Sequence, residues 1–130
     1  MLLDSTSKSL VIVLSGAVTT SQLEFLVTYV ELQASPFKVL GAGGAILGKT
    51  NDMTEQPFLG PPALGVSRQV KFISISQRDT VAATVKIRMG DGSIAVDIFW
   101  ATLDPGDQVY YTQAAGFKVL TAAGELKTTV

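Results

Sequence analysis

The sequence predicts an all-β domain, an antiparallel β-sandwich that is jelly-roll-like and has about eight short strands. Apolar residues alternate with other residues over positions 81–89 and again over 94–100, which is the period of a half-buried strand. Turn signals rich in Gly, Asp and Pro separate such stretches, at 90–93 and at 104–107. No stretch is convincingly helical, and short strands joined by Gly/Pro turns indicate a sandwich or jelly roll.

The first elements follow in order from residue 1. Residues 1–9 are predicted to be an N-terminal arm. Residues 10–14 are continuously apolar and predict a strand covered on both faces. Residues 23–32 predict a longer strand with Leu23, Phe25, Val27 and Tyr29 on one face, although their spacing also fits a helix. A brief strand follows at 37–40.

Residues 41–68 predict a long irregular loop. This stretch holds six of the twelve glycines and three of the five prolines. A loop of this length is uncommon inside a compact domain and tends to bind a partner. A small strand at 45–47 is an alternative within it. From residue 69 onward the hairpins resume, so that residues 10–130 form a single domain of ordinary size.

Composition excludes several classes of function. The net charge is −1 and the ten basic residues are spread along the chain, which argues against nucleic-acid binding. There is no Cys or His, so disulfides, thiolate metal sites and the commonest general base are absent. No apolar segment is long enough for a transmembrane helix, and we expect no membrane partner. Charged residues make up only 16%, which indicates either an apolar surface that meets a partner or simply many Ala and Val residues.

Residues 43–50 match the phosphate-loop pattern G-x-x-x-x-G-K-[ST] through Gly43, Gly48, Lys49 and Thr50. A phosphate loop needs a helix directly after the Ser/Thr, and Pro57, Pro61 and Pro62 follow too soon to sustain one. We therefore interpret the match as chance and expect no cofactor.

Carboxylates and aromatic residues are the remaining candidates for a site. Asp91, Asp104 and Asp107 lie in predicted turns, where Asp caps its own backbone, so neither acid–base chemistry nor a metal is expected. Trp100 shares a face with Ile98 and Val96 and is predicted to lie in the core, whereas Phe99 and Tyr111 are predicted to point outward. Without His to activate Ser or Thr, the chain is not predicted to be an enzyme.

Five segments, at residues 10–20, 68–75, 79–85, 101–111 and 116–124, resemble a pattern found in small virion structural proteins of tailed bacteriophages. Among these, capsid decoration (cement) proteins are the most similar. The resemblance implies a non-enzymatic β-sandwich in the phage head, present in the host cytoplasm during assembly. It also implies the major capsid protein as partner and a homo-oligomer, with a trimer favoured and a dimer possible.

Two alternatives to capsid decoration stay open. One is a neck, tail or fibre-base protein of the virion, and the other is a carbohydrate-binding β-sandwich that uses Phe99, Trp100 and Tyr111. For decoration, the contact regions are expected in the arm, the 10–14 strand and the irregular loop. The expected interface residues are Leu10, Ile12, Leu14, Ile46, Leu47, Phe58, Leu59, Phe99 and Tyr111.

Overall fold

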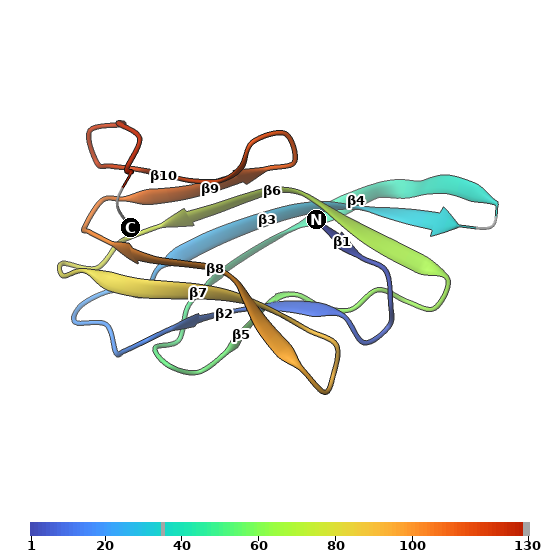
Figure 1. Ribbon diagram of the computed structural model, residues 1–130, viewed down its shortest axis with the longest axis horizontal. Helices are drawn as coiled ribbons and strands as arrows, with labels where there is room; N and C mark the ends of the chain where they lie inside the picture. The colour runs from blue at the N-terminus through green and yellow to red at the C-terminus, as the bar shows by residue number, and fades with distance from the viewer. Residues whose placement is uncertain (35, 129–130) are drawn as a thin grey trace.

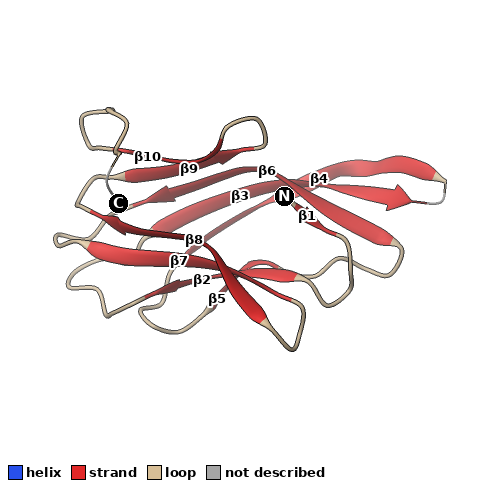
Figure 2. Cartoon of the chain, viewed as in Figure 1, coloured by secondary structure: helices blue, strands red, loops and turns tan. Residues whose placement is uncertain are grey.

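The structure is a computed structural model that describes residues 1–34 and 36–128, and it consists of two antiparallel β-sheets packed as a sandwich. No helix occurs in these residues (Figure 2). The predicted all-β sandwich is confirmed, with ten strands rather than about eight. They are β1 (Leu2–Leu3), β2 (Ser9–Leu14), β3 (Glu24–Ala34), β4 (Phe37–Lys49), β5 (Gln56–Leu59), β6 (Val66–Ser76), β7 (Ala83–Gly90), β8 (Ala95–Leu103), β9 (Gln108–Thr112) and β10 (Gly116–Leu120).

The larger sheet has six strands, in the order β10-β9-β6-β3-β4, with β1 pairing to β6 beside β9. The smaller sheet has four, in the order β5-β2-β7-β8. The chain crosses between the sheets repeatedly, for example from β2 to β3 and from β6 to β7. Figure 1 shows the β3–β4 hairpin extending past the smaller sheet.

The core fills the space between the sheets and follows the predicted alternation. Phe25 and Val27 of β3 belong to the same core cluster as Val85 and Ile87 of β7, and all four are at most 6% exposed. Phe25 packs edge-on against Phe58, with ring centroids 4.9 Å apart. The helical alternative for residues 23–32 is wrong, because β-branched and aromatic residues favour a pleated, half-buried surface.

Residues 1–9 do not form a free arm. β1 pairs with β6, and Leu3 is completely buried. The Met1 amine also donates a hydrogen bond to the Tyr111 hydroxyl over 2.9 Å. The prediction was wrong because a two-residue strand has no readable period. These residues pair with the part of the β6 edge that β9 leaves open, and no pattern within residues 1–9 indicates this partner.

The irregular loop predicted for 41–68 is also wrong, since β4 continues to Lys49 and both β5 and the start of β6 fall inside the range. Two of its glycines have a packing role. A Cβ on Gly48 would lie 2.6 Å from the Phe25 ring, and one on Gly44 would lie 3.0 Å from the Tyr29 hydroxyl. These glycines admit the aromatic side chains paired opposite them in β3, so they do not break the strand.

Candidate functional site

Most residues predicted to form an interface lie in the core. β2 places its even-numbered residues between the sheets, whereas Val11 and Val13 on its other face are only half-buried. The 10–14 strand is therefore not a contact region through its large side chains. Ile46 is partly buried against the core, and Leu47 alone of the set is highly exposed, at 77%. The predicted interface residues that are at most 2% exposed are Leu10, Ile12, Leu14, Phe58 and Leu59.

Trp100 lies on the outer surface and not in the core as predicted, with 63% of it exposed. In the pairing of β8 with β7, Phe99 lies opposite Ile87 and Asp97 lies opposite Arg88, so Ile98 is an extra residue. This β-bulge reverses the alternation between Val96 and Phe99. Alternation counted from residue 94 therefore assigns Trp100 to the wrong face of β8.

The predicted surface of Phe99, Trp100 and Tyr111 does not exist, because two of the three rings point inward. Phe99 stacks on Phe117 with centroids 4.4 Å apart, and Tyr111 packs on Phe117 at 4.9 Å. Tyr111 is only 8% exposed. These three residues therefore offer no common platform on which a sugar could stack.

The phosphate-loop match lies in β4 and the turn that follows it. Gly43, Gly48 and Lys49 belong to the strand, and Asn51 bridges Thr54 where a helix would have to begin. Thr50 is 3% exposed; its hydroxyl accepts a hydrogen bond from the Leu23 amide and donates one to Gln22. This segment lacks the helix N-terminus that a phosphate loop requires, and its hydroxyl is bonded within the fold.

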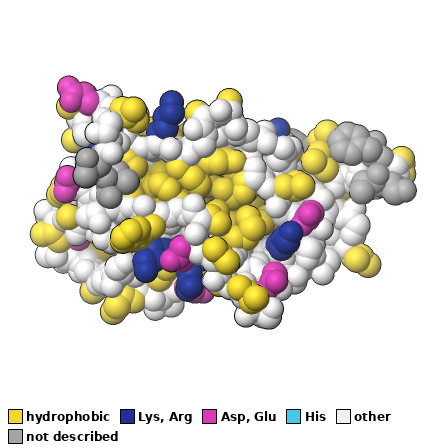
Figure 3. Space-filling model, viewed as in Figure 1, with side chains coloured by type: hydrophobic (Ala, Val, Ile, Leu, Met, Phe, Trp, Pro, Cys, Tyr) yellow, Lys and Arg dark blue, Asp and Glu magenta, His cyan; other side chains and the backbone are white. Residues whose placement is uncertain are grey.

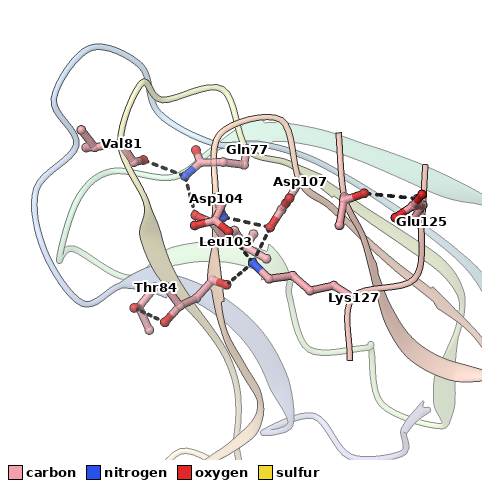
Figure 4. Close-up of polar contacts among 10 residues, drawn as sticks. Gln77, Val81, Thr84, Leu103, Asp104, Asp107, Glu125 and Lys127 are labelled. Atoms are coloured by element: carbon pink, nitrogen blue, oxygen red, sulfur yellow. Dashed lines mark hydrogen bonds and ion pairs between the residues drawn. The ribbon is translucent and has the colours of Figure 1, made fainter. Parts of the chain in front are cut away.

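The carboxylates predicted to lie in turns do so, and one of them anchors the end of the chain. Asp91 accepts hydrogen bonds from the amides of Ser93 and Ile94. Asp107 is buried and accepts bonds from the Asp104 amide and from Lys127 Nζ, at 2.8 and 2.7 Å (Figure 4).

Lys127 ties the C-terminal segment to the turn between β8 and β9. Its Nζ also reaches Asp104 Oδ2 at 3.0 Å and the Thr102 carbonyl at 3.3 Å. The hydrogen bonds to Asp107 and Asp104 raise the pKa of Lys127 above its usual value. We call this group of contacts the Lys127 clasp.

Asp79 is a structural carboxylate that the sequence analysis missed. It is 3% exposed and accepts bonds from the amides of Thr19, Thr20, Ser21 and Thr80, and from the Thr20 hydroxyl. These bonds, above all the one from the Thr19 amide, hold the pKa of Asp79 far below its usual value. One indication of this role is visible in the sequence, the position of Asp79 directly before the β7–β8 hairpin. Most of its partners lie some sixty residues earlier, so a local pattern could not identify them.

One side of the sandwich is open and apolar. There, β8 at the edge of the smaller sheet faces β9 and β10 of the larger sheet, and Figure 3 shows hydrophobic side chains gathered between them. The stacked rings of Phe99 and Phe117 join the two sheets, with Tyr111 behind them. β8 adds the exposed side chain of Val96, at 58%, whereas Trp100, at 63%, lies on the outer face of the same edge strand. We call this surface the open side.

Strand addition is blocked at three sheet edges. β5 has four residues and contains Pro57, and the C-terminal segment covers β10, with the Lys127 amide bonded to the Val119 carbonyl. β8 carries the bulge, and its edge carbonyl at Thr102 is occupied by Lys127 Nζ. Such features protect edges from further pairing. A partner would therefore bind the open side through side chains.

Residues 1–34 and 36–128 contain neither a candidate metal site nor a candidate membrane span. No group of three or more acidic side chains is placed so that it could hold a metal ion. No helix in this part of the chain could span a membrane. No protein-family model, curated protein or solved structure matches the chain.

Proposed function

We propose that this protein is a structural protein of a tailed-phage virion, namely a capsid decoration protein that binds across contacts between major capsid proteins. The resemblance of its strand and turn segments to such proteins suggests the setting. The observation that carries the proposal is the open side, an apolar surface bordered by the edge strand β8, whose outer face carries the exposed Trp100. Exposed apolar surface of this kind typically meets a protein partner, and Trp is often a dominant contact.

A decoration protein stabilises the shell by mass action. It binds the assembled lattice and not the dissociated subunits, so each bound copy shifts the equilibrium toward the intact particle. No chemical step is needed, which agrees with a chain that has neither Cys nor His. We place the protein in the phage head, with the host cytoplasm as its location during assembly, and we propose a homo-oligomer in which a trimer is favoured over a dimer.

The test uses particles of the parent phage that lack this protein. They should break at lower temperature and under weaker osmotic shock, and adding back the purified protein should restore both properties. Trp100→Ala combined with Val96→Glu should weaken rebinding by about tenfold or more, since a single interface Trp is often worth at least ~2 kcal/mol. Leu64→Glu is the matched control, because Leu64 is 90% exposed in the connection between β5 and β6.

Two results would overturn the proposal. Particles lacking the protein could show unchanged heat and osmotic resistance, which would remove the stabilising role. Alternatively, the particle could hold a dozen copies or fewer instead of hundreds. That count would place the protein in the neck, tail or fibre base.

A further inference from the structure

One sheet edge is not protected against strand addition. The two sheets have edges at β5, β8, β10 and β4, and the first three are blocked as described above. β4 pairs with β3 on one side, whereas no strand among the described residues pairs with its other side. Its register with β3 is regular over residues 44–49, which contain no Pro, and shifts beyond Gly44. Residues 44–49 therefore form an open edge, which we call the β4 edge, and a further strand can bind at such an edge.

The pairing with β3 shows which backbone groups of β4 point outward. The Thr50 amide, directly after the strand, donates a hydrogen bond to the Leu23 carbonyl over 2.9 Å, so Thr50 faces β3. Successive residues of an antiparallel strand direct their N–H and C=O groups alternately to one side and to the other. Lys49, Leu47 and Ala45 therefore direct these groups away from β3. In the described part of the chain, no other strand or loop bonds the outward groups of these three residues.

The side chains of the β4 edge are centred on Leu47. Ala45, Leu47 and Lys49 lie on the outer face of the sheet and are exposed, Leu47 at 77%. Ile46 turns to the other face and is partly buried against the core. A large apolar side chain is thus exposed at the middle of the edge, two residues from a small side chain in one direction and from a cation in the other.

We propose that the β4 edge pairs with the β4 edge of a second copy of this chain, antiparallel and about a two-fold axis at Leu47. In this register Leu47 lies opposite Leu47 of the second copy, and Ala45 lies opposite Lys49 of the second copy. Each of the three outward residues then exchanges both N–H···O bonds with the residue opposite it. The two exposed leucines cover each other, and no like charges meet, because each Lys49 lies opposite an Ala45.

A second copy fits the β4 edge better than a foreign strand for two reasons. The outward residues are spaced evenly on both sides of Leu47, so the edge is complementary to itself under a two-fold rotation. A centre at Ile46 would instead place Lys49 opposite residue 43, beyond the register shift, and would leave only two regular pairs. The pairing also uses the last open edge of the described residues, so the assembly closes at two copies and does not grow into a fibre.

The dimer goes beyond the proposed function, which does not say which surface joins the copies, and it does not rest on it. The resemblance favours a trimer, whereas the β4 edge favours a dimer. β4 and β10 lie at opposite edges of the larger sheet, so the open side stays free in the dimer. A monomer in solution would overturn the dimer and leave the capsid role standing. Phage particles whose stability does not depend on this protein would overturn the capsid role and leave the dimer.

The first test is cross-linking through one added cysteine, since the chain has none of its own. In Leu47→Cys the two Cα atoms at position 47 would lie about 5.5 Å apart, within the range that a disulfide spans. Ala45→Cys is the matched control on the same face of the strand. Its two copies are offset by four residues of about 3.4 Å each, which is too far for a disulfide. Under mild oxidation Leu47→Cys should form the covalent dimer at least about tenfold faster than Ala45→Cys, because only its thiols are held together.

The second test is sedimentation of the full chain at several concentrations from about 1 µM to about 1 mM, because a small interface gives a weak dimer. Leu47→Pro should weaken the dimer by about tenfold or more and keep the fold, since the N–H that Pro lacks points away from β3. Leu47→Lys, which places like charges opposite each other, should do the same if the Pro variant does not fold. Circular dichroism reports whether each variant is folded. A monomer at every concentration, a trimer that both variants leave intact, or equal cross-linking of Leu47→Cys and Ala45→Cys would overturn the proposed pairing.

Discussion

Replacing Gly48 by Ala tests the packing that explains the glycines of β4. The added Cβ would lie 2.6 Å from Phe25 Cζ and 3.1 and 3.2 Å from the two neighbouring ring atoms. Ordinary contact begins near 3.4 Å, so the ring or the strand has to move by almost an ångström. Phe25 is 6% exposed and packs edge-on against Phe58, so its ring has little room to turn away.

The expected cost follows from two opposing effects. Overpacking a buried site costs roughly 1–3 kcal/mol. Replacing Gly by Ala in a strand recovers about 0.5–1 kcal/mol, because Gly loses more conformational freedom on folding. We expect a net loss of about 1–2 kcal/mol in the free energy of unfolding. For a chain of this size, that corresponds to a fall of roughly 4–8 °C in Tm.

Urea and thermal denaturation measure the loss, with Gly16→Ala as the control. A Cβ at Gly16 would have no atom within 4 Å, so this variant should match or slightly exceed the unmodified chain. Phe25→Leu replaces the ring with a smaller side chain, so Gly48→Ala should reduce the free energy of unfolding less in the double variant than alone. A Gly48→Ala protein that is as stable as the unmodified chain would refute the reasoning.

Three further predictions concern single side chains. Trp100→Ala should change the free energy of unfolding by no more than ~0.5 kcal/mol, because Trp100 is largely exposed, whereas Leu103→Ala should cost about 2–5 kcal/mol in urea denaturation; a large loss at Trp100 would restore its place in the core. Asp79→Asn should destabilise the protein at pH 7. Because folding lowers the pKa of Asp79, its contribution is present above the ordinary Asp value of about 3.9 and is lost as pH falls below it, so the stability of the variant should depend less on pH between 2 and 4. Lys127→Met should cost about 1 kcal/mol by leaving the buried Asp107 without its cation, and should speed exchange of the backbone amide of residue 127, which bonds the Val119 carbonyl. Folding raises the pKa of Lys127, so the unmodified chain should lose this contribution as pH rises past about 10.4, and an identical alkaline profile for the variant would contradict the clasp.

Local patterns predicted most of the strands. The alternation in residues 81–89 became β7, with Val85 and Ile87 buried, because a period of two puts successive side chains on opposite faces of any strand. The turns at 90–93 and 104–107 were also predicted, since Asp and Gly set turn geometry through bonds to their own neighbours.

Local patterns failed where a partner distant in the sequence decides the outcome. The glycines of β4 were interpreted as loop residues, although Gly48 admits Phe25 from the neighbouring strand. Trp100 was assigned to the wrong face because a single bulged residue, Ile98, inverts the alternation that follows it. Asp79 was overlooked because the amides that bind its carboxylate belong to residues 19–21.

The sequence by itself determined the class of this fold, because alternation and turn chemistry are properties of short segments, and its composition shows that the chain has no Cys or His. Only the tertiary structure decided which apolar side chains stay exposed and which backbone amides bind the buried carboxylate of Asp79. Exposure depends on register across strands and on the cover that a second sheet provides. A shift of one residue in strand register changes both the face on which a side chain lies and the cover above it. No short segment of the sequence indicates such a shift.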